Sequence, residues 1–163
     1  GWKKKKSLNR YSIGVEIQNQ GHAHGYKNFS LKQFKSIKKL LKVLMKKYKI
    51  NINNVLGHSD IAPERKKDPG EKFPWKKLSQ KNIGIWHDFS PTYLKKFRKK
   101  KISLGNKNFF KYLSNIGYCL NSKNRFIVNK AIKAFQRRFR KELINGLPDQ
   151  ECLIIARNLS YKV

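Results

Sequence analysis

The chain has 163 residues and a strongly basic composition, with 39 Lys and Arg against 9 Asp and Glu and a formal net charge of +30. Hydrophobic residues make up 39% and aromatic residues 12%. This is enough apolar material for the core of one medium or two small domains, so we expect a folded protein rather than general disorder. No apolar run approaches the roughly 20 residues of a transmembrane helix, and no signal peptide is visible after the basic N-terminus.

Three explanations of the positive charge stay open at this point. A basic surface attracts polyanions, so nucleic acid and an anionic cell-wall polymer are both possible partners. The third explanation is compositional bias, because the lysines are scattered and accompany many Asn and Ile residues. The charge is therefore a weak guide to function. The two cysteines, Cys119 and Cys152, fit neither a CxxC motif nor a disulfide framework, and we expect free thiols.

The first half of the chain shows a strand, helix, strand pattern. Residues 12–17 alternate between apolar and small or polar side chains, which predicts a strand with Glu16 on its open face. Residues 21–28 are rich in Gly, His and Asn and predict a loop. Ser30 is a predicted helix N-cap. The helix behind it has an apolar face with lysines opposite, formed by Leu31, Phe34, Ile37, Leu40, Leu41, Leu44 and Tyr48.

A short buried strand at Val55–Leu56 is expected to deliver His58 at its end. The pattern therefore predicts an α/β layer with the functional site at the strand ends.

A second, helical unit is predicted after a charged linker at residues 91–107. Apolar residues at helical spacing predict one helix over 109–116, ended by Gly117, and another over 128–139. Asp149 can cap a third. These elements form a small three-helix domain at residues 108–163.

His58 and Asp68 are the strongest candidates for metal ligands. Imidazole and carboxylate are ligands that catalytic zinc uses. Pro63 lies between the two residues and Pro69 directly follows Asp68, and both stiffen the loop. The structural alternative is a histidine with a packing role and an aspartate that caps a turn. Glu16 is a candidate general base, and Lys66 is a candidate for stabilising an oxyanion, although it is one lysine among many.

Several sequence segments in the first half of the chain, and their order, resemble the zinc-dependent N-acetylmuramoyl-L-alanine amidases. The closest resemblance is to the AmiD-type enzymes of the amidase-2 group. That group is related in fold to phage T7 lysozyme and the peptidoglycan recognition proteins, so the resemblance implies an α/β fold with a mixed β-sheet flanked by helices. The resemblance runs from about Trp2 to Trp86 and is carried by the runs SIGVEI at 12–17, GHSDIAP at 57–63, RKKDPG at 65–70 and FPW at 73–75. The second unit resembles the helical peptidoglycan-binding module of these enzymes, through the runs IGY at 116–118 and AIKAFQ at 131–136 and through Phe139, Gly146 and Asp149.

The resemblance implies a division into a catalytic domain at residues 1–90, the linker at 91–107 and a peptidoglycan-binding domain at 108–163. It implies that His58 and Asp68 bind Zn²⁺, that Glu16 is the catalytic carboxylate and that Lys66 stabilises the tetrahedral intermediate. The reaction would be hydrolysis of the amide between N-acetylmuramic acid and L-alanine. Peptidoglycan or muropeptides would be the partners of a monomer located in the cell envelope or periplasm.

One departure from the family pattern changes the expectation. The family supplies a further zinc-binding histidine from a strand that precedes residues 12–17, and the chain has no histidine there. His22, His24 and His87 do not match that position, although His22 and His24 follow the predicted strand of Glu16. We therefore expect the C-terminal portion of an amidase with impaired activity and without its first strand. The alternatives are a non-catalytic peptidoglycan-binding protein and, without a groove-reading motif to support it, a nucleic-acid binder.

Overall fold

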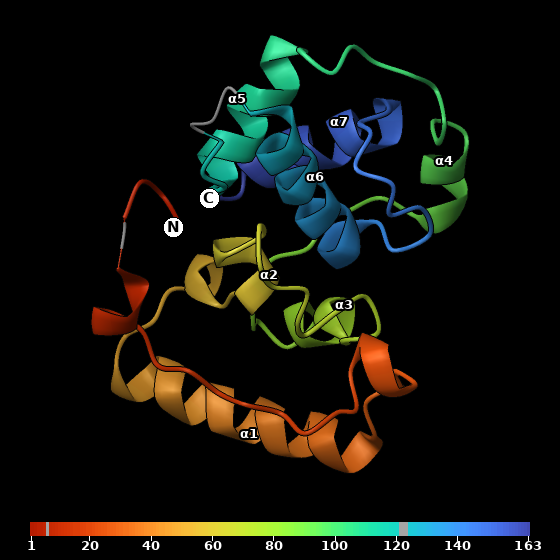
Figure 1. Ribbon diagram of the computed structural model, residues 1–163. Coiled ribbons are helices and arrows are strands. Elements are labelled where there is room, and N and C mark those ends of the chain that lie inside the picture. Colours follow the sequence, from red (N-terminus) through yellow and green to blue (C-terminus); the bar gives the residue numbers. More distant parts are fainter. Residues whose placement is uncertain (6, 121–123) are drawn as a thin grey trace.

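The computed structural model describes residues 1–5, 7–120 and 124–163, and across these ranges the regular secondary structure is helical. Figure 1 shows α1 along one side of the molecule, the short helices α2 and α3 in the middle and the helices near the C-terminus on the other side. The α-helices are α1 (Leu31–Lys47), α2 (His58–Ile61), α3 (Trp75–Ser79), α4 (Pro91–Lys95), α5 (Lys107–Ile116), α6 (Arg125–Phe139) and α7 (Gln150–Ser160). Short 3-10 helices lie at Leu8–Arg10, His22–His24 and Ile52–Asn54.

The predicted α/β fold with a mixed sheet is wrong for the part of the chain that the structure describes. The described residues contain isolated β-bridges but no strand. Residues 12–17 are an extended, irregular segment that runs along α1 (Figure 1), and Val55–Leu56 is not a strand either. The physical reason is that alternation reports an extended backbone, whereas a strand also needs a neighbouring strand to bond its N–H and C=O groups.

The predicted helix after Ser30 is confirmed. The Ser30 hydroxyl accepts a hydrogen bond from Gln33 N, and the Gln33 side chain accepts one from Ser30 N, which forms a capping box. The apolar face of α1 packs on a small buried cluster around Trp75 and Leu78. Its lysines lie mainly on the exposed side. α1 thus buries its apolar face on this cluster and leaves a basic face exposed.

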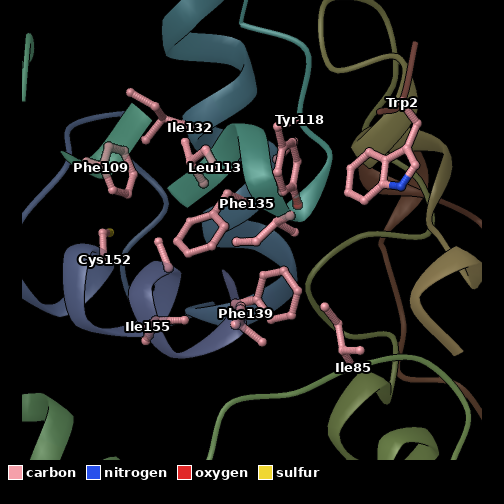
Figure 2. Packing of buried hydrophobic residues seen from close by; sticks show 14 of the residues in the cluster. Trp2, Ile85, Phe109, Leu113, Tyr118, Ile132, Phe135, Phe139, Cys152 and Ile155 are labelled. Carbon is pink, nitrogen blue, oxygen red and sulfur yellow. The ribbon is translucent and has the colours of Figure 1, made fainter. Parts of the chain in front are cut away.

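The three helices predicted in the second unit are also confirmed, as α5, α6 and α7. Gly117 ends α5 with a φ of 133°, and Asp149 caps α7 by accepting a hydrogen bond from Cys152 N. Their apolar faces meet in the main core, where Phe135 lies among Leu113, Tyr118 and Phe139 (Figure 2). The same buried cluster includes Trp2 and Ile85 from the first half of the chain. The core is therefore continuous across the two halves of the sequence.

The predicted linker region, 91–107, contains α4. Its residues make close polar contacts with α7 and with the residue that caps it. The Arg98 guanidinium bonds both carboxylate oxygens of Glu151, with Nε at 2.7 Å and Nη2 at 2.8 Å. Lys99 N donates to the carboxylate of Asp149 at 3.1 Å. Both acidic residues are buried. These contacts hold the region against the helical unit.

His87 is a buried histidine in the segment between α3 and α4. Its side chain packs beside Trp86 and Phe89, and its Nδ1 atom has no hydrogen-bond partner among the described residues. Burial lowers the pKa of His87 from 6.5 to about 4, an effect that outweighs a backbone hydrogen bond at Phe139. The folded protein therefore holds this ring neutral at a pH where the unfolded chain would protonate it.

We predict an acid-dependent loss of stability from His87. Between pH 6.5 and 4 the unfolded state binds the extra proton, so the free energy of unfolding falls as the pH drops through this window. The loss from this residue should reach about 3 kcal/mol at pH 4. Urea unfolding of the wild type and of His87→Gln at pH 7, 6, 5 and 4 measures the difference. His24→Gln, at an exposed histidine, should keep the wild-type pH dependence. An identical pH dependence in all three proteins would contradict the prediction.

Candidate functional site

The structure brings His58 and Asp68 together. His58 is the first residue of α2, and its Nδ1 atom lies 3.0 Å from Oδ2 of Asp68 in the loop that follows. The two side chains are 37% and 59% exposed, so a ligand can reach both. Two zinc ligands at tetrahedral angles are separated by about 3.3 Å when the bonds to the metal are about 2.0–2.1 Å long. The pair therefore fits one edge of a zinc site.

Backbone contacts fix the approach of the two segments. Ser59 N donates to the carbonyl oxygen of Asp68 at 2.8 Å, which ties the first turn of α2 to the aspartate. Gly57 precedes His58 at the tightest point, where an added Cβ would lie 2.9 Å from Cδ of Pro69. The glycine thus permits the close packing that sets the distance between His58 and Asp68.

Asp60 is a site-forming residue that the sequence analysis missed. Its Oδ2 atom accepts a hydrogen bond from Gly57 N at 2.8 Å, and this contact caps α2. Its Oδ1 atom accepts one from the Tyr118 hydroxyl at 2.7 Å, and Arg138 pairs with Oδ2 at 2.5 Å. An aspartate three residues after the glycine N-cap is a capping signal that could have been read from the sequence. The partners from the distant helices could not.

Glu16 and Lys66 lie in the first half of the chain but do not contact the His58–Asp68 pair through a hydrogen bond or ion pair among the described residues. Glu16 is exposed on the extended segment beside α1. Lys66 is half-buried in the loop between His58 and Asp68, and its backbone N donates to the Ala62 carbonyl at 3.0 Å. Their catalytic roles stay predictions.

A second group of residues holds the loop just after Asp68. The Tyr26 hydroxyl donates to the Pro69 carbonyl at 2.7 Å and accepts from Lys72 N at 3.0 Å. Burial raises the pKa of Tyr26 to about 12, so its hydroxyl stays protonated. The ring of His22 lies 4.4 Å from that of Tyr26 between centroids. Tyr26 therefore clamps the loop from the direction of the 21–28 segment.

His22 is directed at a carboxylate other than Asp68. Its Nε2 atom lies 3.0 Å from Oε2 of Glu71, and Arg137 of α6 approaches the same oxygen at 3.8 Å. Burial acts to raise the pKa of Glu71, but the hydrogen bond from His22 and the charges of His22 and Arg137 outweigh it, and the pKa is lowered. Within the described ranges, no three His, Cys, Asp or Glu side chains gather in a way that could hold a metal ion.

The segment that contains the candidate site matches a known protein family. Residues 1–71, which include Glu16, His58, Lys66 and Asp68, match the profile of the Amidase_2 family, described as N-acetylmuramoyl-L-alanine amidase. This segment is therefore similar to the amidase-2 family.

Individual relatives extend the similarity over the whole chain. N-acetylmuramoyl-L-alanine amidase AmiD of Escherichia coli K12 is 34% identical over 99% of this chain and 61% of its own length. The 1,6-anhydro-N-acetylmuramyl-L-alanine amidase AmpD of Haemophilus influenzae is 35% identical over 45% of this chain and 38% of its own. The chain thus spans about 61% of the length of the AmiD relative.

Solved structures give the same relationship. E. coli AmiD, in complex with the substrate anhydro-N-acetylmuramic acid-L-Ala-D-gamma-Glu-L-Lys, superposes with a TM-score of 0.86 at 32% identity, over 99% of this chain and 65% of that one. AmpDh3 of Pseudomonas aeruginosa gives a TM-score of 0.83 at 31% identity, over 99% of this chain and 66% of that one. The path of the backbone over nearly the whole of this chain is therefore similar to about two thirds of each of these amidases.

We predict that Tyr26→Phe destabilises the protein. The substitution leaves the ring in place but removes the hydroxyl that bonds Pro69 and Lys72. The cost should be about 1–2 kcal/mol, because the half-buried carbonyl of Pro69 and the N–H of Lys72 lose their partner. Chemical denaturation measures the change in the free energy of unfolding. Tyr11→Phe, at a tyrosine that is 74% exposed, is the control and should stay near the wild type. Equal stability of both variants would show that the clamp contributes nothing.

Proposed function

We propose that the protein is a zinc-dependent amidase that hydrolyses the bond between N-acetylmuramic acid and L-alanine in peptidoglycan or in muropeptides released from it. The observation that carries the proposal is the 3.0 Å approach of His58 Nδ1 and Asp68 Oδ2, inside the segment that matches the amidase family. The exposure of both side chains also supports it, because a catalytic metal must keep a position open to the substrate.

His58 and Asp68 would supply two of the ligands of the metal. Zinc bound there would polarise the scissile carbonyl and lower the pKa of a water molecule. The carboxylate of Glu16 would take the proton of the attacking water and pass it to the nitrogen of the leaving L-alanine. The ammonium group of Lys66 would stabilise the negative charge that develops on the carbonyl oxygen.

The second half of the chain has a proposed role in holding the polymer. Residues 108–163 resemble a peptidoglycan-binding module, and we assign them this function as a unit that follows the catalytic part at 1–90 and the connecting region at 91–107. A high positive charge would favour contact with an anionic wall. Every helix in the described ranges is too short or too polar to cross a bilayer. The proposed site of action is the cell envelope, and the proposed state is a monomer.

The proposal predicts zinc-dependent release of peptides that begin with L-alanine from purified peptidoglycan or an anhydromuramyl peptide. A chelator should abolish the release, and added Zn²⁺ should restore it. Glu16→Gln should lower the rate by about 10²–10⁴-fold because it removes the base without changing the size of the side chain. Liquid chromatography with mass detection of the released peptides gives the rate.

Glu64→Gln is the matched control, since Glu64 is an exposed carboxylate in the loop that follows α2. It should keep the wild-type rate. Full activity of Glu16→Gln would refute the assigned base. If the chain sediments with insoluble peptidoglycan but releases no peptide with Zn²⁺ present, the non-catalytic binding alternative is supported instead.

A further inference from the structure

The buried carboxylate of Asp60 lies next to the candidate ligand pair, His58 and Asp68, and holds the backbone of that region. Asp60 is 2% exposed, and it accepts hydrogen bonds from three donors in three segments of the chain. Gly57 N lies in the turn that begins α2, the Tyr118 hydroxyl follows α5, and the Arg138 guanidinium comes from α6. Two of the three donors therefore belong to the helical half of the molecule.

Arg138 reaches this carboxylate from the far end of α6. Its side chain is 3% exposed, and its Nη2 atom donates to the Val55 carbonyl at 3.0 Å. The guanidinium carbon stands 4.1 Å from the centre of the Trp75 ring. One cation thus contacts the segment before His58, the carboxylate after it and an aromatic ring of the first half. Such a planar, multiple contact is a geometry that arginine makes and lysine does not.

The contact continues from Asp60 to the ligands. The Oδ2 atom that pairs with Arg138 also accepts the hydrogen bond of Gly57 N, immediately before His58. The next residue, Ser59, donates its N–H to the Asp68 carbonyl. A shift of the Asp60 carboxylate would therefore move the start of α2, and with it both His58 and the backbone bond to Asp68.

We infer that Arg138 is a positioning residue for the His58–Asp68 pair and that it acts through the Asp60 carboxylate. The inference rests on the proposed function, because it assigns the pair to a metal. It gives the helical half a second role: besides holding polymer, α6 sets the geometry of the candidate site. Replacement of residues that contact the ligands of a metal site commonly lowers the affinity for the metal by about 10–100-fold.

Arg140, at the same end of α6, is a matched control that distinguishes positioning by Arg138 from a purely structural role. Arg140 is 1% exposed and lies two residues further on, where it approaches Asp149 at 3.4 Å and Cys152 Sγ at 3.0 Å. Its partners belong to α7 and its cap, away from His58. Arg138→Met and Arg140→Met should both lower stability, because each leaves a buried carboxylate without its cation. Only the first should disturb the ligands.

The experiment measures zinc binding by the chain in competition with a chromophoric chelator, together with the imidazole nitrogen NMR signals of His58 in the metal-free protein. Arg138→Met should weaken zinc binding about tenfold and shift the His58 signals. Arg138→Lys should fall between it and the wild type. Arg140→Met should leave zinc binding and the His58 signals as in the wild type while its melting temperature drops.

The outcomes separate this inference from the proposed function. Absence of zinc binding by the wild-type chain would refute the metal assignment, while the His58 signals of Arg138→Met would still decide whether Arg138 positions the histidine. Unchanged zinc affinity and unchanged signals in a folded Arg138→Met variant would overturn the inference. If that variant does not fold, Tyr118→Phe replaces it, since it removes a single bond to Asp60. It should give the same changes at smaller size, and wild-type behaviour would overturn the inference.

Discussion

The buried charge of Asp60 is the constraint on which the arrangement of the molecule depends. A carboxylate removed from water is costly unless cations and hydrogen-bond donors surround it. Asp60 finds them in Gly57, Tyr118 and Arg138, which are far apart in the sequence. The packing of α5 and α6 against the first half of the chain is therefore tied to the local structure at His58. The continuous apolar core that includes Trp2 and Ile85 reinforces the same packing.

Several of the few acidic residues in this strongly basic chain are buried and paired with arginines. Asp60, Asp149 and Glu151 are all buried, and each pairs with an arginine, respectively Arg138, Arg140 and Arg98. Arginine suits these positions because its charged fork can bond a carboxylate at two points. The lysines of α1, in contrast, lie mainly on the exposed side. The interior is thus balanced in charge, and the excess that makes the chain so basic is mostly on the surface.

The helices could be predicted from the sequence because their signals are local. Caps at Ser30 and Asp149 and the glycine after α5 stand beside the apolar periodicity that they bound. The pairing of His58 with Asp68 was an expectation from the family resemblance, supported by the prolines that stiffen the loop. The sheet prediction failed because pairing depends on a second strand, which the alternation in residues 12–17 does not specify. Arg138 could not be found, since nothing local distinguishes it from the basic residues around it.

The extended segment at residues 12–17 has a consequence for how the protein behaves at high concentration. Ile13 and Val15 are 47% and 36% exposed, and in the described part of the chain no strand pairs with the backbone beside them. An exposed, extended segment with apolar side chains and unpaired backbone groups is a template on which another extended chain can add by hydrogen bonding. The lysine-rich flank of α1 opposes the addition of a second copy by charge repulsion, which salt screens. Self-association through this segment should therefore grow with ionic strength, opposite to the salt response of binding to an anionic polymer.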